Sequence, residues 1–183
     1  MIATLTVDDG LPVTHRASGL TALVDPAHPA LAQLRTALAG KLDPASVGQI
    51  AHGFLACNGG AVDAVSVLER GKGNCLGLSA LIVSTLLGLP QFEEQDVWVA
   101  VVVQPGSVGS HAVVVYHAIP TSSWGMVDPG GAMQPTIIPQ ALDPRFDALP
   151  WQAFGGPSDG RVRLLFNHRR ILITESRGSG TGT

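Results

Sequence analysis

Apolar residues recur every three or four positions between about residues 25 and 70, which is the spacing of amphipathic helices. The first predicted helix carries Leu31, Leu34 and Leu38 and ends at Gly40. A second is predicted from an N-cap at Asp43 to the turn signal Asn-Gly-Gly, and a third runs up to the Glu-Arg-Gly that precedes a Lys-Gly-Asn-Cys phrase. The pattern therefore predicts a helical first half.

A fourth helix is predicted from about Asn74, ending before Gly88 and Pro90. Apolar residues cover every side of it, which is typical of a helix buried all round. The segment supplies about 13 helical residues, whereas a membrane span needs about 20 apolar residues. We therefore expect a core helix and no membrane span.

The pattern changes to strands after Asp96, where β-branched residues dominate. A stretch rich in Pro and Gly, residues 129–160, is predicted to be surface loop. Predicted strands flank it on both sides, and the last two form a hairpin: residues 97–103, 111–117, 124–127, 161–166 and 170–174.

Helices followed by antiparallel strands predict an α+β fold, in which the N-terminal helices pack on an antiparallel sheet. We expect a single domain over residues 1–176. Residues 177–183, rich in Gly, Ser and Thr, are predicted to be a flexible tail.

The chain is poor in charge: Asp, Glu, Lys and Arg make up 14% of its 183 residues, against about 25% in a typical globular protein. A net charge of −3 gives no electrostatic footprint for nucleic acid, and two cysteines cannot form a disulfide framework. No basic leader precedes an apolar run, so a cytoplasmic protein is expected. Between residues 73 and 127 the only charged side chains are Glu93, Glu94 and Asp96, which predicts a dry core there.

Cys75 is the first candidate for chemistry, because it opens the buried helix. The positive end of a helix favours the thiolate, and its free N–H groups can stabilise an oxyanion. The alternative is that Cys75 is a small buried apolar residue. Cys57, expected near the C-terminal end of its helix, is predicted to be a packed core thiol. A metal site is not expected, since no Cys-x-x-Cys or His-x-x-x-His spacing occurs.

A hairpin is predicted to bring His111 next to Asp128. If residues 118–121 form a four-residue loop, position 111 faces position 128 across the two strands. A carboxylate beside an imidazole fixes its tautomer and stabilises its charged form. His117 lies on the same face but roughly 20 Å along the strand, so we favour His111.

Three phrases follow one another in the sequence: Gly-Asn-Cys-Leu-Gly-Leu-Ser around Cys75, Leu-Gly-Leu-Pro after the buried helix, and Trp-Gly-Met-Val-Asp-Pro ending after Asp128. Over about residues 61–131 the chain resembles the core of the transglutaminase-like superfamily, in its bacterial branch. The resemblance implies a papain-like fold with Cys75 as nucleophile, His111 as general base and acid, and Asp128 orienting the histidine. We also expect Asn74 and Trp124 to contact substrate.

The predicted function is cysteine-dependent acyl transfer without a cofactor, with hydrolysis of a peptide or amide bond ahead of transamidation. The partners would be a peptide, a protein or a small acyl substrate. Two alternatives remain open. One is a non-catalytic protein that binds a peptide or partner on the same fold. The other is an enzyme that takes an acyl group from coenzyme A, because the Pro-Gly-Gly after Asp128 also resembles arylamine N-acetyltransferases. The oligomeric state is not predicted.

Overall fold

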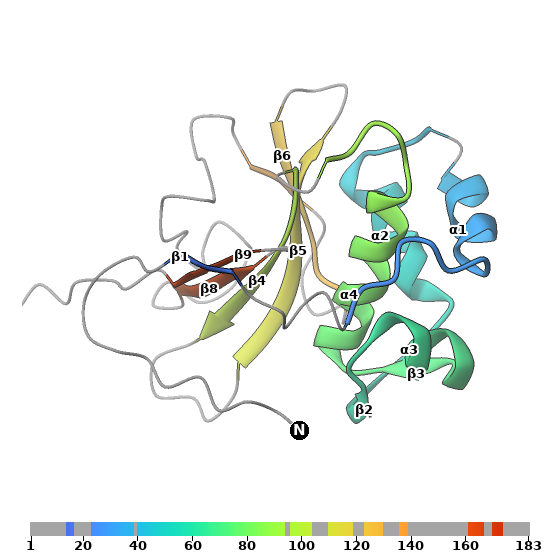
Figure 1. The fold of residues 1–183 in the computed structure, drawn as a ribbon, viewed down its shortest axis with the longest axis horizontal. Helices are drawn as coiled ribbons and strands as arrows, with labels where there is room; N and C mark the ends of the chain where they lie inside the picture. The colour runs from blue at the N-terminus through green and yellow to red at the C-terminus, as the bar shows by residue number, and fades with distance from the viewer. Residues whose placement is uncertain are drawn as a thin grey trace, which may run out of the picture.

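The fold consists of a layer of helices packed against a sheet (Figure 1). The computed structural model describes residues 14–16, 23–38, 40–93, 96–103, 110–118, 123–129, 136–138, 161–166 and 170–173. The helices are α1 (Leu31–Leu38), α2 (Pro44–His52), α3 (Ala64–Arg70) and α4 (Cys75–Leu87). The predicted tail, residues 177–183, lies outside the described residues.

The strands that the structure describes form two sheets. The larger has seven strands in the order β1-β9-β8-β4-β5-β6-β7, and all neighbouring pairs are antiparallel. The smaller pairs β2 with β3 in parallel. Their bounds are β1 Thr14–Arg16, β2 Leu55–Ala61, β3 Lys72–Gly73, β4 Val97–Val103, β5 Ser110–Ala118, β6 Ser123–Val127, β7 Thr136–Ile138, β8 Arg161–Phe166 and β9 Arg170–Ile173.

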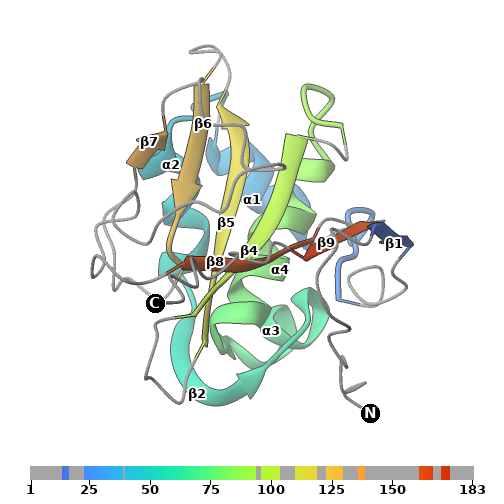
Figure 2. The ribbon, with the colours of Figure 1, turned by 90° about the vertical axis from the view of Figure 1, so that its left-hand side faces the viewer.

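The α+β fold class is confirmed, with helices preceding an antiparallel sheet. Figure 2 looks onto this sheet, where β4, β5 and β6 lie side by side in front of α1 and α4. One prediction was wrong: the stretch 129–160 is not all loop, because β7 pairs with β6. The rest of that stretch beyond Pro129 lies outside the described residues.

The second predicted helix is shorter than its pattern indicated. It begins as expected, with Asp43 as N-cap accepting the Ser46 N–H, but ends at His52. The chain then turns at Gly53 and enters β2, so that Leu55 is 66% exposed instead of packing on a helix face. The tertiary pairing of β2 with β3 therefore overrides the local helical spacing. This pairing also brings the chain to the start of α4.

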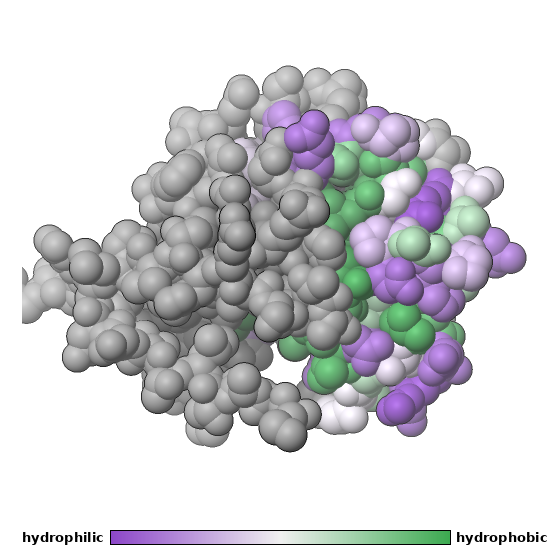
Figure 3. All heavy atoms as spheres, in the orientation of Figure 1, coloured by the Kyte–Doolittle hydropathy of each residue, from purple (hydrophilic) through white to green (hydrophobic). Residues whose placement is uncertain are grey.

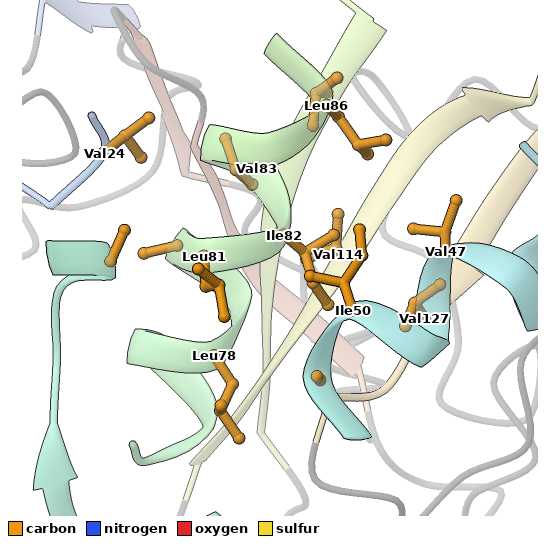
Figure 4. Packing of buried hydrophobic residues seen from close by; sticks show 14 of the residues in the cluster. Val24, Val47, Ile50, Leu78, Leu81, Ile82, Val83, Leu86, Val114 and Val127 are labelled. Carbon is orange, nitrogen blue, oxygen red and sulfur yellow. The ribbon is translucent and has the colours of Figure 1, made fainter. Parts of the chain in front are cut away.

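Helix α4 lies at the centre of the core, between the other helices and the sheet (Figure 1). Its residues from Gly77 to Leu86 are all buried, as its apolar pattern predicted. Ile82 of α4 and Val114 of β5 lie together in the core, and Leu78 lies one turn earlier on the helix (Figure 4). Other apolar side chains extend this cluster over α1, α2 and β6, among them Leu31, Leu38, Val47, Ile50 and Val127.

Tyr116 on β5 ties the sheet to the segment before α2. Its hydroxyl donates to the Leu42 carbonyl at 2.9 Å, and its ring lies over Gly125 of the paired strand β6. A Cβ at Gly125 would approach the ring to 2.8 Å, so the close fit needs a glycine there. Burial raises the pKa of Tyr116, which keeps the hydroxyl protonated as a donor.

The outer side of the helical layer is largely hydrophilic, and apolar residues show between it and the sheet (Figure 3). Within the described ranges, no helix is both long enough and apolar enough to cross a membrane.

Arg35 on α1 caps the C-terminal end of α4. Its guanidinium donates to the carbonyls of Ser84 and Thr85 at 3.2 Å each, and also to that of Pro26. The last carbonyls of a helix lack partners within it, and a cation is favourable at that end. Gly88 makes room for the guanidinium, since a Cβ there would come within 2.0 Å of it.

Replacing this cap should destabilise the fold. Because Arg35→Met removes two charge-assisted hydrogen bonds at the end of the central helix and a third to the Pro26 carbonyl, we expect the free energy of unfolding to fall by about 2–3 kcal/mol. Arg70→Met, at an exposed site in the last turn of α3, should cost under about 1 kcal/mol. Urea denaturation of both variants measures the difference. Equal losses of unfolding free energy in the two variants would show that Arg35 does not stabilise the end of α4 more than an exposed arginine stabilises α3.

Candidate active site

The N-terminal end of α4 carries Cys75 as its first helical residue. Asn74 is the N-cap, and its side-chain oxygen accepts the Gly77 N–H at 2.9 Å. The backbone N–H of Asn74 donates to the Ala61 carbonyl at 3.0 Å, which anchors the helix start to β2. The predicted position of Cys75 at a helix start is therefore observed.

Three glycines allow β2 and β3 to lie directly against the first turn of α4. A Cβ at Gly77 would lie 2.0 Å from the Ala61 oxygen, and one at Gly73 would lie 2.6 Å from the Val67 side chain. A Cβ at Gly60 would lie 2.6 Å from the Gly73 carbonyl carbon. No side chain fits at these positions, so the position of Cys75 is set by contact between backbones.

The prediction for Cys57 was wrong in its location. The residue lies on β2, not at the end of a helix, so the helix dipole argument against its reactivity does not apply. Its sulfur and the Asn74 nitrogen each lie 2.8 Å from the place that a Cβ of Gly60 would take. Cys57 is thus a half-buried thiol close to the residue that precedes Cys75. Its role as a packing residue stays a prediction.

His111 and Asp128 are in direct contact. The His111 Nε2 lies 2.8 Å from the Asp128 Oδ1, and the two side chains are 26% and 0% exposed. The pairing that predicted this contact was wrong by two residues, because Val114, not position 112, faces Val127. A shift of two keeps both side chains on the same face of the sheet. Continuing the observed register makes His111 and Asp128 diagonal neighbours, a separation that long side chains bridge.

Cys75 and His111 are joined by a hydrogen bond between their side chains. Because Nε2 faces Asp128, Nδ1 is the ring nitrogen left for the thiol. The bond to His111 lowers the pKa of the Cys75 thiol, burial opposes it, and the N–H groups of Ala112 and Leu76 add to the lowering. The bond to Asp128, followed by that to Cys75, raises the pKa of His111 to about 9. The environment therefore favours a thiolate paired with an imidazolium.

One backbone donor at the helix start stays available. The N–H of Asn74 bonds to Ala61, that of Leu76 points to the Cys75 sulfur, and that of Gly77 bonds to the Asn74 side chain. Within the described part of the chain, the N–H of Cys75 has no hydrogen-bond partner. When the sulfur attacks a carbonyl carbon, the carbonyl oxygen gains negative charge, and a donor beside the sulfur can stabilise it.

The other candidates of the sequence lie elsewhere or have other contacts. His117 stacks on Trp124 with ring centroids 5.7 Å apart, six residues along β5 from His111. Trp124 is 8% exposed. The side-chain oxygen of Asn74 is engaged in capping. Substrate contact by Asn74 and Trp124 stays a prediction.

Sequence reasoning missed the backbone of Ala112 as part of the site. Its N–H contacts the Cys75 sulfur, and its carbonyl accepts a bond from the buried Ser79. An alanine gives no sign of such a role in the sequence. The one signal is that the predicted strand 111–117 is longer than the predicted strand 124–127, so that some of its backbone groups lack a partner on that strand. Among the residues with a described placement, no group of three or more His, Cys, Asp or Glu side chains could hold a metal ion.

The sequence matches no protein-family profile and no curated protein. The fold is similar to solved structures of LapG from Legionella pneumophila. One of these is 14% identical over 90% of this chain and 79% of LapG, with a TM-score of 0.49. The calcium-bound form is also 14% identical, over 89% of this chain and 78% of LapG, with a TM-score of 0.47.

Adding a methyl group at Gly77 should disrupt the site. The Cβ of Gly77→Ala would overlap the Ala61 oxygen, so the first turn of α4 must move, and we expect a loss of about 3 kcal/mol in unfolding free energy. Gly53→Ala is the matched control, because nothing lies within 4 Å of its Cβ position and its φ is −78°. Thermal and urea denaturation compare the two. An unchanged stability for Gly77→Ala would contradict the close packing of β2 on α4.

Proposed function

We propose that this protein is a cysteine-dependent acyl-transfer enzyme that hydrolyses a peptide or amide bond, with Cys75, His111 and Asp128 as its catalytic residues. The observation that carries the proposal is the continuous chain of contacts from the Cys75 thiol through the His111 ring to the buried Asp128 carboxylate. This chain starts at the N-terminal end of a buried helix, where a thiolate is stabilised.

Acylation starts from the ion pair of the Cys75 thiolate and the His111 imidazolium. The Cys75 thiolate attacks the carbonyl carbon, and the oxygen takes up the negative charge beside the Cys75 N–H. The carbon–nitrogen bond breaks as the His111 imidazolium gives its proton to the leaving amine. The products of this step are a thioester on Cys75 and a free amine.

Deacylation reverses the roles. The neutral His111 ring takes a proton from water, the resulting hydroxide attacks the thioester, and the Cys75 thiolate leaves. Asp128 stabilises the imidazolium that is present at the start of acylation and forms again in deacylation, and it holds the ring in one orientation. If an amine replaced the water, the same steps would transfer the acyl group to it.

A linear acyl substrate such as a peptide fits the site better than a buried cofactor would. Cys75 is half-buried and the His111 side chain is 26% exposed, so the pair lies near the surface. Peptides and proteins present amide bonds to a site of this kind. The substrate class of the proposal is therefore a peptide or protein amide.

The thiolate should be detectable without a known substrate. We expect iodoacetamide to alkylate Cys75 well below pH 7, because the thiol pKa is lowered, whereas an ordinary thiol needs a pH of about 8 or above. In His111→Ala the midpoint of the profile should rise toward about 8.5, since the largest cause of the lowering is removed. Mass spectrometry of the Cys75 peptide gives the rate at each pH.

Cys57→Ser is the control for this experiment and should leave the Cys75 profile unchanged. With a pool of peptide amides, Cys75→Ser should abolish hydrolysis and Cys57→Ser should not. A Cys75 that resists alkylation below pH 8 would contradict the enzyme and favour a binding protein. A stable acetyl group on Cys75 after incubation with acetyl-coenzyme A would instead favour coenzyme A-dependent transfer.

The carboxylate should set the proton affinity of the histidine. Asp128 raises the pKa of His111 to about 9, so Asp128→Asn should lower it toward the ordinary 6.5. The His111 imidazolium exists only below the pKa of His111. When this pKa falls, the ion pair with Cys75 is therefore lost at a lower pH than in wild type. An NMR titration of the His111 ring protons measures the shift. Asp43→Asn, which retains an N-cap side chain far along the chain, should leave the titration unchanged.

A further inference from the structure

Three buried hydroxyl groups lie on α4, and one of them differs in its partner. Ser84 and Thr85 donate to carbonyls of their own helix, those of Ala80 and Leu81, at 2.7 and 2.8 Å. Ser79 donates out of the helix, to the Ala112 carbonyl on β5 at 3.4 Å. All three side chains are fully buried. Ser79 alone among them links the helix of the nucleophile to the strand of the histidine.

The backbone of Ala112 is free for this contact because β5 is longer than β6. Their pairing begins at Val114 opposite Val127 and runs toward the turn, so the start of β5 has no partner on β6. In an antiparallel strand the N–H and the carbonyl of one residue point to the same side. The two groups of Ala112 therefore share one edge, where α4 takes the place of the missing strand.

Both groups of Ala112 are held from the same face of α4. The N–H contacts the sulfur of Cys75 and the carbonyl accepts from Ser79. Residues four apart on a helix lie one above the other, so Cys75 and Ser79 form a pair of contacts on adjacent turns. Because Ala112 directly follows His111, this pair sets how far the imidazole lies from the sulfur.

Resting on the proposed function, we infer that Ser79 is a positioning residue. Its hydroxyl donates to the Ala112 carbonyl and holds the start of β5 against the first turns of α4. This contact keeps His111 within hydrogen-bonding distance of Cys75. The hydrogen bond of Ser79 goes to the backbone of Ala112, the residue after His111, so Ser79 acts on the imidazole through that backbone. Small displacements of this kind cost enzymes large factors in rate.

A buried hydroxyl that only satisfied a buried carbonyl would stabilise the fold without affecting the thiol. A positioning role and a purely stabilising role differ in the pH dependence of Cys75 alkylation. A loss of stability alone does not shift the midpoint of that pH dependence. Ser84→Ala is the matched control on the same helix. It removes an intrahelical bond and also the bond that Ser84 accepts from the Asp25 N–H, yet it lies more than two turns from Cys75.

The experiment is the alkylation of Cys75 by iodoacetamide from pH 4 to 10 in wild type, Ser79→Ala and Ser84→Ala, with urea denaturation of each protein. In Ser79→Ala we expect the midpoint to rise by about one pH unit, which is about tenfold slower alkylation below the midpoint. Ser84→Ala should keep the wild-type profile while losing at least as much stability. Ser79→Thr retains the hydroxyl and should restore the wild-type profile.

Each other outcome overturns the inference. A wild-type profile in Ser79→Ala, or an equal shift in Ser84→Ala, would show that Ser79 has no effect beyond stability. A shift in Ser79→Thr as large as that in Ser79→Ala would show that the hydroxyl is not the cause. If wild-type Cys75 itself reacted only above pH 8, the proposed function would fail first, and this result is distinct from a normal wild-type profile that Ser79→Ala leaves unchanged.

Discussion

The contact between the Ala61 carbonyl and the first turn of α4 is the constraint on which the site depends. That oxygen accepts the Asn74 N–H and lies where a side chain of Gly77 would otherwise be. It can do so only because residue 77 is a glycine, and because β2 bulges between its two points of pairing with Gly73. Cys75 is thereby fixed by backbone atoms on one side and by β5 on the other. A thiol held in this way loses little conformational freedom when it reacts.

The low charge of the chain has its consequence at this site. Asp128 is fully buried, and a carboxylate in such surroundings is costly unless a partner stabilises it. His111 is that partner, and the hydrogen bond to Asp128 is the largest cause of its raised pKa of about 9. No other charged side chain occurs between residues 97 and 127 to compete for the carboxylate. His111 and the N–H groups of Ala112 and Leu76 lower the pKa of the Cys75 thiol, and the region around them in the sequence is almost free of charge.

Most of the fold could be predicted from local signals, and the exceptions have physical reasons. The caps at Asp43 and Asn74 mark helix starts because their side chains accept N–H groups three residues on. The sequence predicts helix for the segment of β2, because its Gly-rich end is typical of a helix stop. Its pairing with β3 is a tertiary contact that leaves no local signal in the sequence. The hairpin register was wrong by two because loop length is not encoded in spacing, yet the face of His111 was right because two is the period of a strand.

The site forms where the sheet becomes uneven. Because β6 ends at Val127, the next residue is released from pairing and its carboxylate can turn toward the diagonal position on β5. The same early end exposes the edge of Ala112 to α4. If β6 continued in register by two more residues, strand hydrogen bonds would take the groups that now contact Cys75 and Ser79. The difference in length between β5 and β6 therefore brings a helix start, a histidine and a buried carboxylate together. Two strands of equal length would pair along their whole length and leave no such place.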